Sequence, residues 1–122
     1  MSNGPVPGTP DDSVVGTRLR DAARTARESR SLDPDVRTAL AELLDELSRT
    51  VDAPGRTPAE VAHLAETTAH LTDALHHAGH DRGVIAAARD RLGALLVRAE
   101  AKAPTAVGLA RQLTDVLARM GI

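Results

Sequence analysis

The stretch SLDPDVRTALAELLDELSRTV, residues 31–51, predicts one helix more clearly than any other part of the chain. Asp33 is a suitable N-cap, Pro34 fits the first helical position because its φ is already helical, and Asp35 complements the positive end of the helix dipole. Apolar side chains then recur at three- and four-residue spacing on one face, namely Val36, Leu40, Leu43, Leu44, Leu47 and Val51. The pattern predicts an amphipathic helix that packs against other helices.

The same periodicity predicts a helix before this one and three after it. The first begins near Asp12 or Ser13 and ends near Arg30, so close to the second helix that the two form an antiparallel hairpin. A glycine in its first turn, Gly16, weakens it. Its apolar stripe is narrow and mostly alanine: Val15, Leu19, Ala22 and Ala26.

Three further start signals follow. Thr57, Pro58 and Glu60 form a capping box with proline at the first position, Asp81 can cap a fourth helix, and Pro104 begins a fifth. The expected inward stripes are Val61, Leu64, Thr68, Leu71 and Leu75 in the third helix, Val84, Ile85, Ala88, Leu92, Leu95, Leu96 and Ala99 in the fourth, and Leu109, Leu113, Val116, Leu117 and Met120 in the fifth.

These elements predict an all-α protein, a small antiparallel helical bundle of four to five helices. We expect a single domain over residues 13–122 after a disordered tail over residues 1–12, which is rich in Pro and Gly and has no apolar periodicity. Gly79 suits the end of the third helix. The sequence leaves open whether helices three and four form a hairpin there or one kinked rod.

The composition of the chain excludes several classes of function. The 122 residues carry a net charge of −2 and include no Cys, Phe, Trp or Tyr. Without cysteine there are no disulfides, thiolate nucleophiles or cysteine metal sites, and without aromatics there are no stacking platforms for single-stranded nucleic acid. No secretory signal and no apolar run of roughly 18 residues is present, so we expect a cytoplasmic protein with no membrane contact. The strong preference for Arg over Lys is typical of a GC-rich bacterial genome.

A core built from Leu, Val and Ala buries little area per residue, so a lone monomer would be marginal. We therefore expect a small helical scaffold or protein-interaction module that self-associates through the Leu-rich faces of helices two, four and five, or docks a helical partner. The candidate interaction residues are Leu113, Leu117, Met120 and Ile122. Almost every Asp, Glu and His falls on a polar face or a cap, so we expect no enzymatic activity, no cofactor and no small-molecule substrate.

The alternative is an accessory protein that binds anions or nucleic acid through the arginine-rich first helix. Its candidate residues are Arg20, Arg24 and Arg27. The second helix is rich in Asp and Glu, however, and opposite charges on neighbouring helices most simply pair with each other. The net charge of the chain also disfavours nucleic acid.

Five histidines raise the question of a metal site. His63, His70 and His77 recur every seven residues on the outer side of the third helix, about 10 Å apart along its axis and too far to share one ion. Asp73, His77 and His80 have metal-ligand spacing, but a helix end at Gly79 would separate them. We predict no metal site and assign these histidines to a solvated face and a helix end.

The C-terminal stretch RAEAKAPTAVGLARQLTDVLARMGI, residues 98–122, resembles the family called domain of unknown function 4404. Its matching residues are Pro104, Thr105, Leu113, Leu117, Met120, Gly121 and Ile122. A looser match covers LRDAARTARESRSLDPDVRTALAELLDEL, residues 19–47. The resemblance implies a compact helical fold and no particular reaction.

Overall fold

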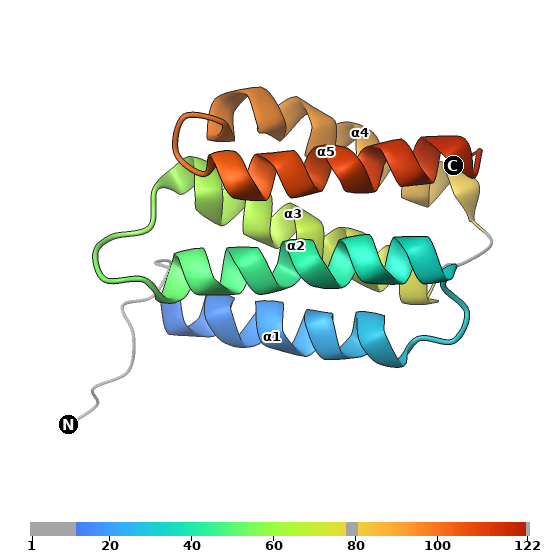
Figure 1. Cartoon of the computed structure of the whole chain (residues 1–122), viewed down its shortest axis with the longest axis horizontal. Coiled ribbons are helices and arrows are strands. Elements are labelled where there is room, and N and C mark those ends of the chain that lie inside the picture. The colour runs from blue at the N-terminus through green and yellow to red at the C-terminus, as the bar shows by residue number, and fades with distance from the viewer. Residues whose placement is uncertain (1–11, 78–80, 122) are drawn as a thin grey trace.

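A computed structural model describes residues 12–77 and 81–121, which form five α-helices and no strand (Figure 1). In chain order these are α1 (Asp12–Glu28), α2 (Pro34–Asp52), α3 (Ala59–His77), α4 (Arg82–Ala99) and α5 (Pro104–Arg119). The prediction of an all-α bundle is confirmed. Among the described residues, no helix combines the length and the low charge that a membrane crossing requires. The predicted tail falls mostly in residues 1–11, outside the described part of the chain.

α2 begins where the sequence predicts. Asp33 is the N-cap of α2, and one of its carboxylate oxygens, Oδ1, accepts a hydrogen bond from the backbone N–H of Asp35 at 2.9 Å. Pro34 occupies the first helical position. The whole predicted apolar face of α2 is buried.

The first two helices form the predicted antiparallel hairpin, with α1 ending at Glu28, slightly before Arg30. Gly16 in α1 has a role that its weak helix propensity does not reveal. A Cβ at this position would lie 2.8 Å from Oδ1 of Asp52, so glycine leaves room for the carboxylate that pairs with Arg20.

The open question about the third and fourth helices is settled in favour of a hairpin. α3 and α4 pack against each other along their lengths (Figure 1). Asp81 caps α4 as predicted, because its Oδ1 accepts a hydrogen bond from the Val84 N–H at 3.2 Å. Gly79, the predicted end residue of the third helix, lies outside the described residues.

The helices differ in how many neighbours they have. α2 packs against α1, α3 and α5, whereas α4 packs against α3 and α5 only. One apolar cluster includes side chains from all five helices. Within it, Thr68 and Thr72 are buried on α3, and each hydroxyl donates to a backbone carbonyl one turn earlier, at 2.8 and 2.9 Å. These threonines therefore satisfy their own hydrogen-bonding groups.

The inward stripes predicted for the first three helices are confirmed, but two residues predicted inward on the last helices are not. Val84, in the first turn of α4, is 44% exposed, and Met120, just after α5, is 40% exposed. Both lie at helix ends, where no neighbouring helix covers them. Leu95, Leu109 and Val116 are half-buried.

Candidate functional site

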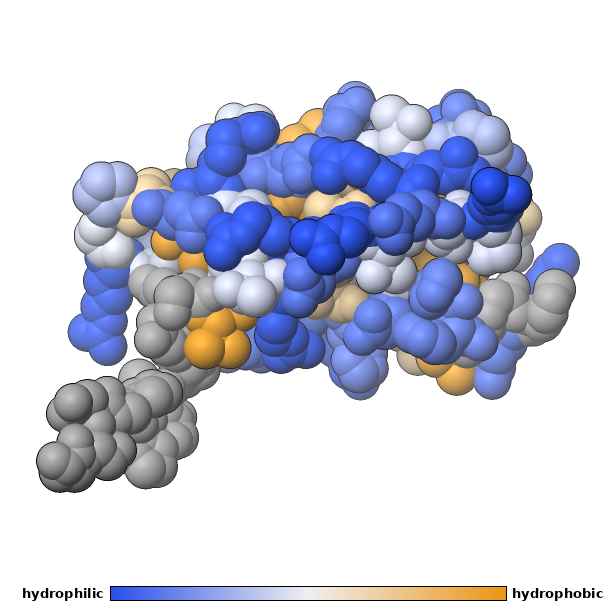
Figure 2. Space-filling model, turned by 90° about the horizontal axis from the view of Figure 1, so that it is seen from below, coloured by the Kyte–Doolittle hydropathy of each residue, from blue (hydrophilic) through white to orange (hydrophobic). Residues whose placement is uncertain are grey.

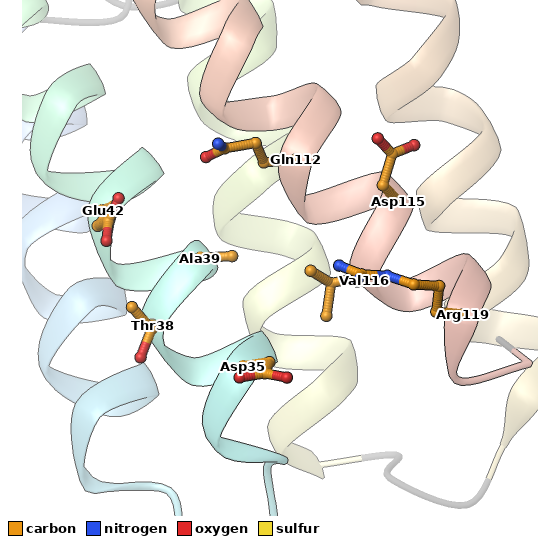
Figure 3. A pocket seen from close by; sticks show the side chains of 8 residues that line it. All are labelled: Asp35, Thr38, Ala39, Glu42, Gln112, Asp115, Val116 and Arg119. Atoms are coloured by element: carbon orange, nitrogen blue, oxygen red, sulfur yellow. The ribbon is translucent and has the colours of Figure 1, made fainter.

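An open groove of about 410 Å³ runs between α2 and α5 (Figure 3). Its floor is apolar, because Ala39 and Val116 are half-buried and pack against the core. Polar side chains form its rims: Asp35, Thr38 and Glu42 from α2, and Gln112, Asp115 and Arg119 from α5. In Figure 3 the Arg119 side chain extends toward Val116.

The three carboxylates of this groove are exposed to water. Within residues 12–77 and 81–121, none of Asp35, Glu42 and Asp115 takes part in an ion pair. A carboxylate that acts as a general acid or base usually has a drier environment and a hydrogen-bonded partner. The groove therefore presents acidic charge to solvent over a small apolar floor.

The arginines of α1 lie beside the acidic residues of α2. Nη1 of Arg20 is 2.7 Å from Oδ2 of Asp52, and Arg27 forms an ion pair with Asp45. Viewed from the α1 side, the molecule is mostly hydrophilic (Figure 2). Two of the three candidate anion-binding residues, Arg20 and Arg27, therefore form ion pairs with acidic residues of the same chain. The third, Arg24, is exposed and has no ion pair among the described residues.

The histidines are distributed along the outside of α3. His63, His70 and His77 are exposed, as predicted. Nδ1 of His76 is 3.2 Å from Oγ of Ser29, and Nδ1 of His77 is 3.1 Å from the carbonyl oxygen of Asp73, one turn earlier. His80 lies outside the described residues. Among those described, no group of three His, Asp or Glu side chains is arranged to hold a metal ion.

The candidate interaction residues at the C-terminus separate into two environments. Leu113 and Leu117 are fully buried on the inner face of α5, packed in the common core. They therefore belong to the core of this chain. Met120 is partly exposed, and Ile122 lies outside the described residues. The leucines of α2 are likewise buried within the chain, whereas Leu109 of α5 is half-buried.

The structure instead exposes apolar residues on α4. Its inner face is formed by Ile85, Ala88, Leu92, Leu96 and Ala99, all buried. On the opposite side Val97 is 77% exposed, and Ala87 and Ala94 are also exposed. We call the exposed residues Ala87, Ala94 and Val97 the α4 outer face. At 3.6 residues per turn the exposed Asp90 lies on the same side, so this face combines small apolar side chains with one carboxylate.

The sequence of α4 contains a signal for the outer face that the predicted inward stripe does not include. The segment RGVIAAARDRLGALLVRA, residues 82–99, has apolar or small residues in every turn and only one acidic residue. When one inward stripe is chosen from such a segment, several apolar residues remain outside that stripe. Their number indicates that α4 has more apolar surface than one face can bury.

One ion pair joins the end of α4 to α5. Nη2 of Arg111 donates a hydrogen bond to Oε1 of Glu100 at 2.9 Å. This hydrogen bond, together with the positive charge, lowers the pKa of the Glu100 carboxyl below its usual value. The same contact raises the pKa of Arg111. The pair lies at the surface, where it links Glu100, just after α4, to α5.

Fold and surface together define the class: a small all-α helical bundle with open, polar-rimmed grooves. The chain belongs to the family described as domain of unknown function (DUF4404), whose model matches residues 36–122. The match includes the C-terminal stretch on which the resemblance was based. It begins inside the looser stretch, so residues 19–35 lie outside it.

No curated protein and no solved structure gives a significant match to the chain.

Proposed function

We propose that this protein is a helical protein-interaction module and that the α4 outer face is its docking surface. The observation that carries the proposal is the exposure of Val97, an apolar side chain in the last turn of α4 that is 77% exposed. Small side chains beside it permit a partner helix to approach closely. The proposal replaces the Leu-rich faces expected from the sequence with a surface that is free in the monomer.

The energetic argument compares the two sides of α4. Burial of apolar surface stabilises by about 25 cal/mol per Å², so an exposed valine leaves roughly 1.5 kcal/mol or more of favourable burial unused. The inner side of α4 already holds it in the bundle through Leu92 and Leu96. The outer side therefore has no structural role in the monomer that would require Val97 to be apolar.

The rest of the bundle is suited to hold this face rigidly. α2 contacts three other helices, and ion pairs join α1 to α2 and α4 to α5. A docking surface on a packed helix needs little reordering when a partner binds. This rigidity supports a scaffold role, in which the bundle presents one helix face.

Photo-crosslinking in the cell that makes the protein tests the proposal. A benzophenone amino acid replaces Val97 in one variant and Val14 in a matched control, because Val14 is a similarly exposed valine, 51% in water, but lies on α1. We expect irradiation to give a discrete adduct from position 97 and none from position 14, with the partner peptide identified by mass spectrometry. Equal adducts from both positions, or none from either, would contradict the proposal.

A further inference from the structure

A groove of about 360 Å³ runs along the side of the α4 outer face that is turned toward α5. Asp90 and Gly93 line it from α4, and Thr114 and Asp115 line it from α5. At 3.6 residues per turn, Asp90, Gly93 and Val97 follow one another on the same side of α4. This cavity, which we call the α4–α5 groove, therefore opens beside the surface to which we assign docking.

The charges that line the α4–α5 groove do not balance within the chain. Within the described residues, the one ion pair of Asp90 is with its sequence neighbour Arg89, at 3.5 Å between Oδ1 and Nη2, and the Asp90 side chain is 74% exposed. Asp115 is exposed and forms no ion pair in the described part of the chain. In Figure 3 its carboxylate points away from the guanidinium of Arg119. Two carboxylates and one guanidinium line the groove, so one further positive charge balances it.

Gly93 leaves the floor of the α4–α5 groove without a side chain. A Cβ at this position would have no heavy atom within 4 Å, so alanine would fit in the folded chain. Alanine is also the better residue for a helix interior. Glycine therefore gives the packing of this chain no advantage, and its effect is to leave room for another side chain against the backbone of α4.

We propose that the partner of the α4 outer face is a helix that carries an arginine, and that this arginine enters the α4–α5 groove between Asp90 and Asp115. The inference rests on the proposed docking surface and names the chemistry of its partner. The aliphatic part of the arginine lies over Gly93. Its guanidinium has five N–H donors in one plane, so it can donate in several directions at once, which an ammonium does less well. The Thr114 hydroxyl donates to the carbonyl oxygen of Arg111 at 2.8 Å and still has a lone pair that can accept.

Docking itself makes a cation from the partner necessary. A helix that covers Ala94 and Val97 also removes water from Asp90, which lies between them on the same side of α4. A carboxylate that loses water without a well-placed cation destabilises the complex. The 3.5 Å contact with Arg89 is longer than the roughly 2.7–2.9 Å of a good charge-assisted hydrogen bond. An arginine on the partner supplies that bond, and helices without one are disfavoured.

A synthetic peptide tests the requirement for arginine. The probe is a capped alanine–glutamine helix with one central arginine, and its control is the same peptide with citrulline, which has nearly the same shape but no charge. In an NMR titration of the full chain, the arginine peptide should shift the backbone amides of Gly93 and Thr114 saturably, with a Kd on the order of 1 mM. Citrulline should weaken binding about five-fold. Equal affinities, or no shifts at either amide, would overturn the inference.

Variants of the chain test the charge and the shape of the groove separately. Asp115→Asn should weaken the arginine peptide about five-fold, whereas Asp21→Asn, which removes an exposed carboxylate from α1, should not. Gly93→Leu should fill the groove and abolish the shift at Thr114. Gly108→Leu is its control, because Gly108 also has open space around it but does not line this groove. Circular dichroism checks that both leucine variants are folded, and equal peptide affinities of the two would overturn the inference.

Photo-crosslinking at position 97 separates this inference from the proposed function. With benzophenone at position 97, adding Asp115→Asn should lower the yield of the adduct about five-fold, and adding Asp21→Asn should leave the yield unchanged. An adduct whose yield does not respond to Asp115→Asn would keep the docking surface and overturn the arginine. No adduct from the chain without these changes would overturn the docking surface, and the arginine-bearing partner with it.

Discussion

α2 and α4 have similar lengths and belong to one core, yet they use their apolar residues differently. α2 separates a fully buried leucine face from a polar face, and it contacts three helices. α4 has apolar residues on both sides, contacts two helices and leaves Val97 exposed. The comparison shows that an apolar side chain in this bundle does not by itself mark the core, because its position among neighbouring helices decides whether it is covered.

Truncating the core of α2 should have the largest effect. Leu44 is fully buried, so Leu44→Ala removes apolar contacts and leaves a cavity. We expect the free energy of unfolding to fall by about 2–5 kcal/mol. Urea denaturation monitored by circular dichroism measures the change. A loss below about 1 kcal/mol would mean that α2 is not the centre of the bundle.

Removing the helix caps should have an intermediate effect and sharpens the same comparison. Asp33→Ala should destabilise by about 1 kcal/mol, because the Asp35 N–H loses its acceptor. Asp33→Asn keeps an acceptor and should stay near the parent. Asp81→Ala should destabilise less than Asp33→Ala, because the Asp81 bond is longer. The reverse order, measured in the same denaturation assay, would show that the start of α4 is held more tightly than that of α2.

The pair between Glu100 and Arg111 should make a smaller, pH-dependent contribution. The pKa of Glu100 is lowered in the folded protein, so its stabilisation is fully present above the usual carboxyl pKa and is lost as the pH falls through the lowered value. Thermal melts of the parent and of Glu100→Gln should therefore differ most near neutral pH and converge in acid. A difference that grows on acidification would show that the pair does not join α4 to α5.

The outer face of α4 should give the smallest effect on the monomer. Val97→Ser should change the free energy of unfolding by less than about 0.5 kcal/mol at concentrations where the protein is monomeric, because the side chain is already in water. Denaturation at micromolar protein measures this. A loss of unfolding free energy as large as that caused by Leu44→Ala would place Val97 in the core. α2 and α4 would then not differ in how they use their apolar residues.

Local chemistry explains which features could be predicted. The start of α2 depends on Asp33 and Pro34, which act on the backbone beside them, so the sequence alone locates it. The cap at Asp81 and the self-satisfied hydroxyl of Thr68 are local in the same way. Leu113 and Leu117 could be recognised as apolar from the sequence. Whether they are buried within this chain or against another chain depends on helices far away in the sequence.

The candidate site was less predictable for the same reason. The pairing of Arg20 with Asp52 joins residues 32 positions apart, and it follows from the antiparallel packing of α1 on α2. The exposure of Val84 and Met120 reflects helix ends that no neighbour covers. Neither follows from periodicity, which describes one helix at a time.

The sequence by itself determined the helical class, the starts of α2, α4 and α5 and the inward stripes of the first three helices, because caps, prolines and a repeat near 3.6 residues act within one turn or one helix. Tertiary structure alone decided that α3 and α4 form a hairpin, that two arginines of α1 are paired with α2, and that the apolar surplus of α4 faces outward. These depend on which helices become neighbours, and a helix with two neighbours can bury only one side.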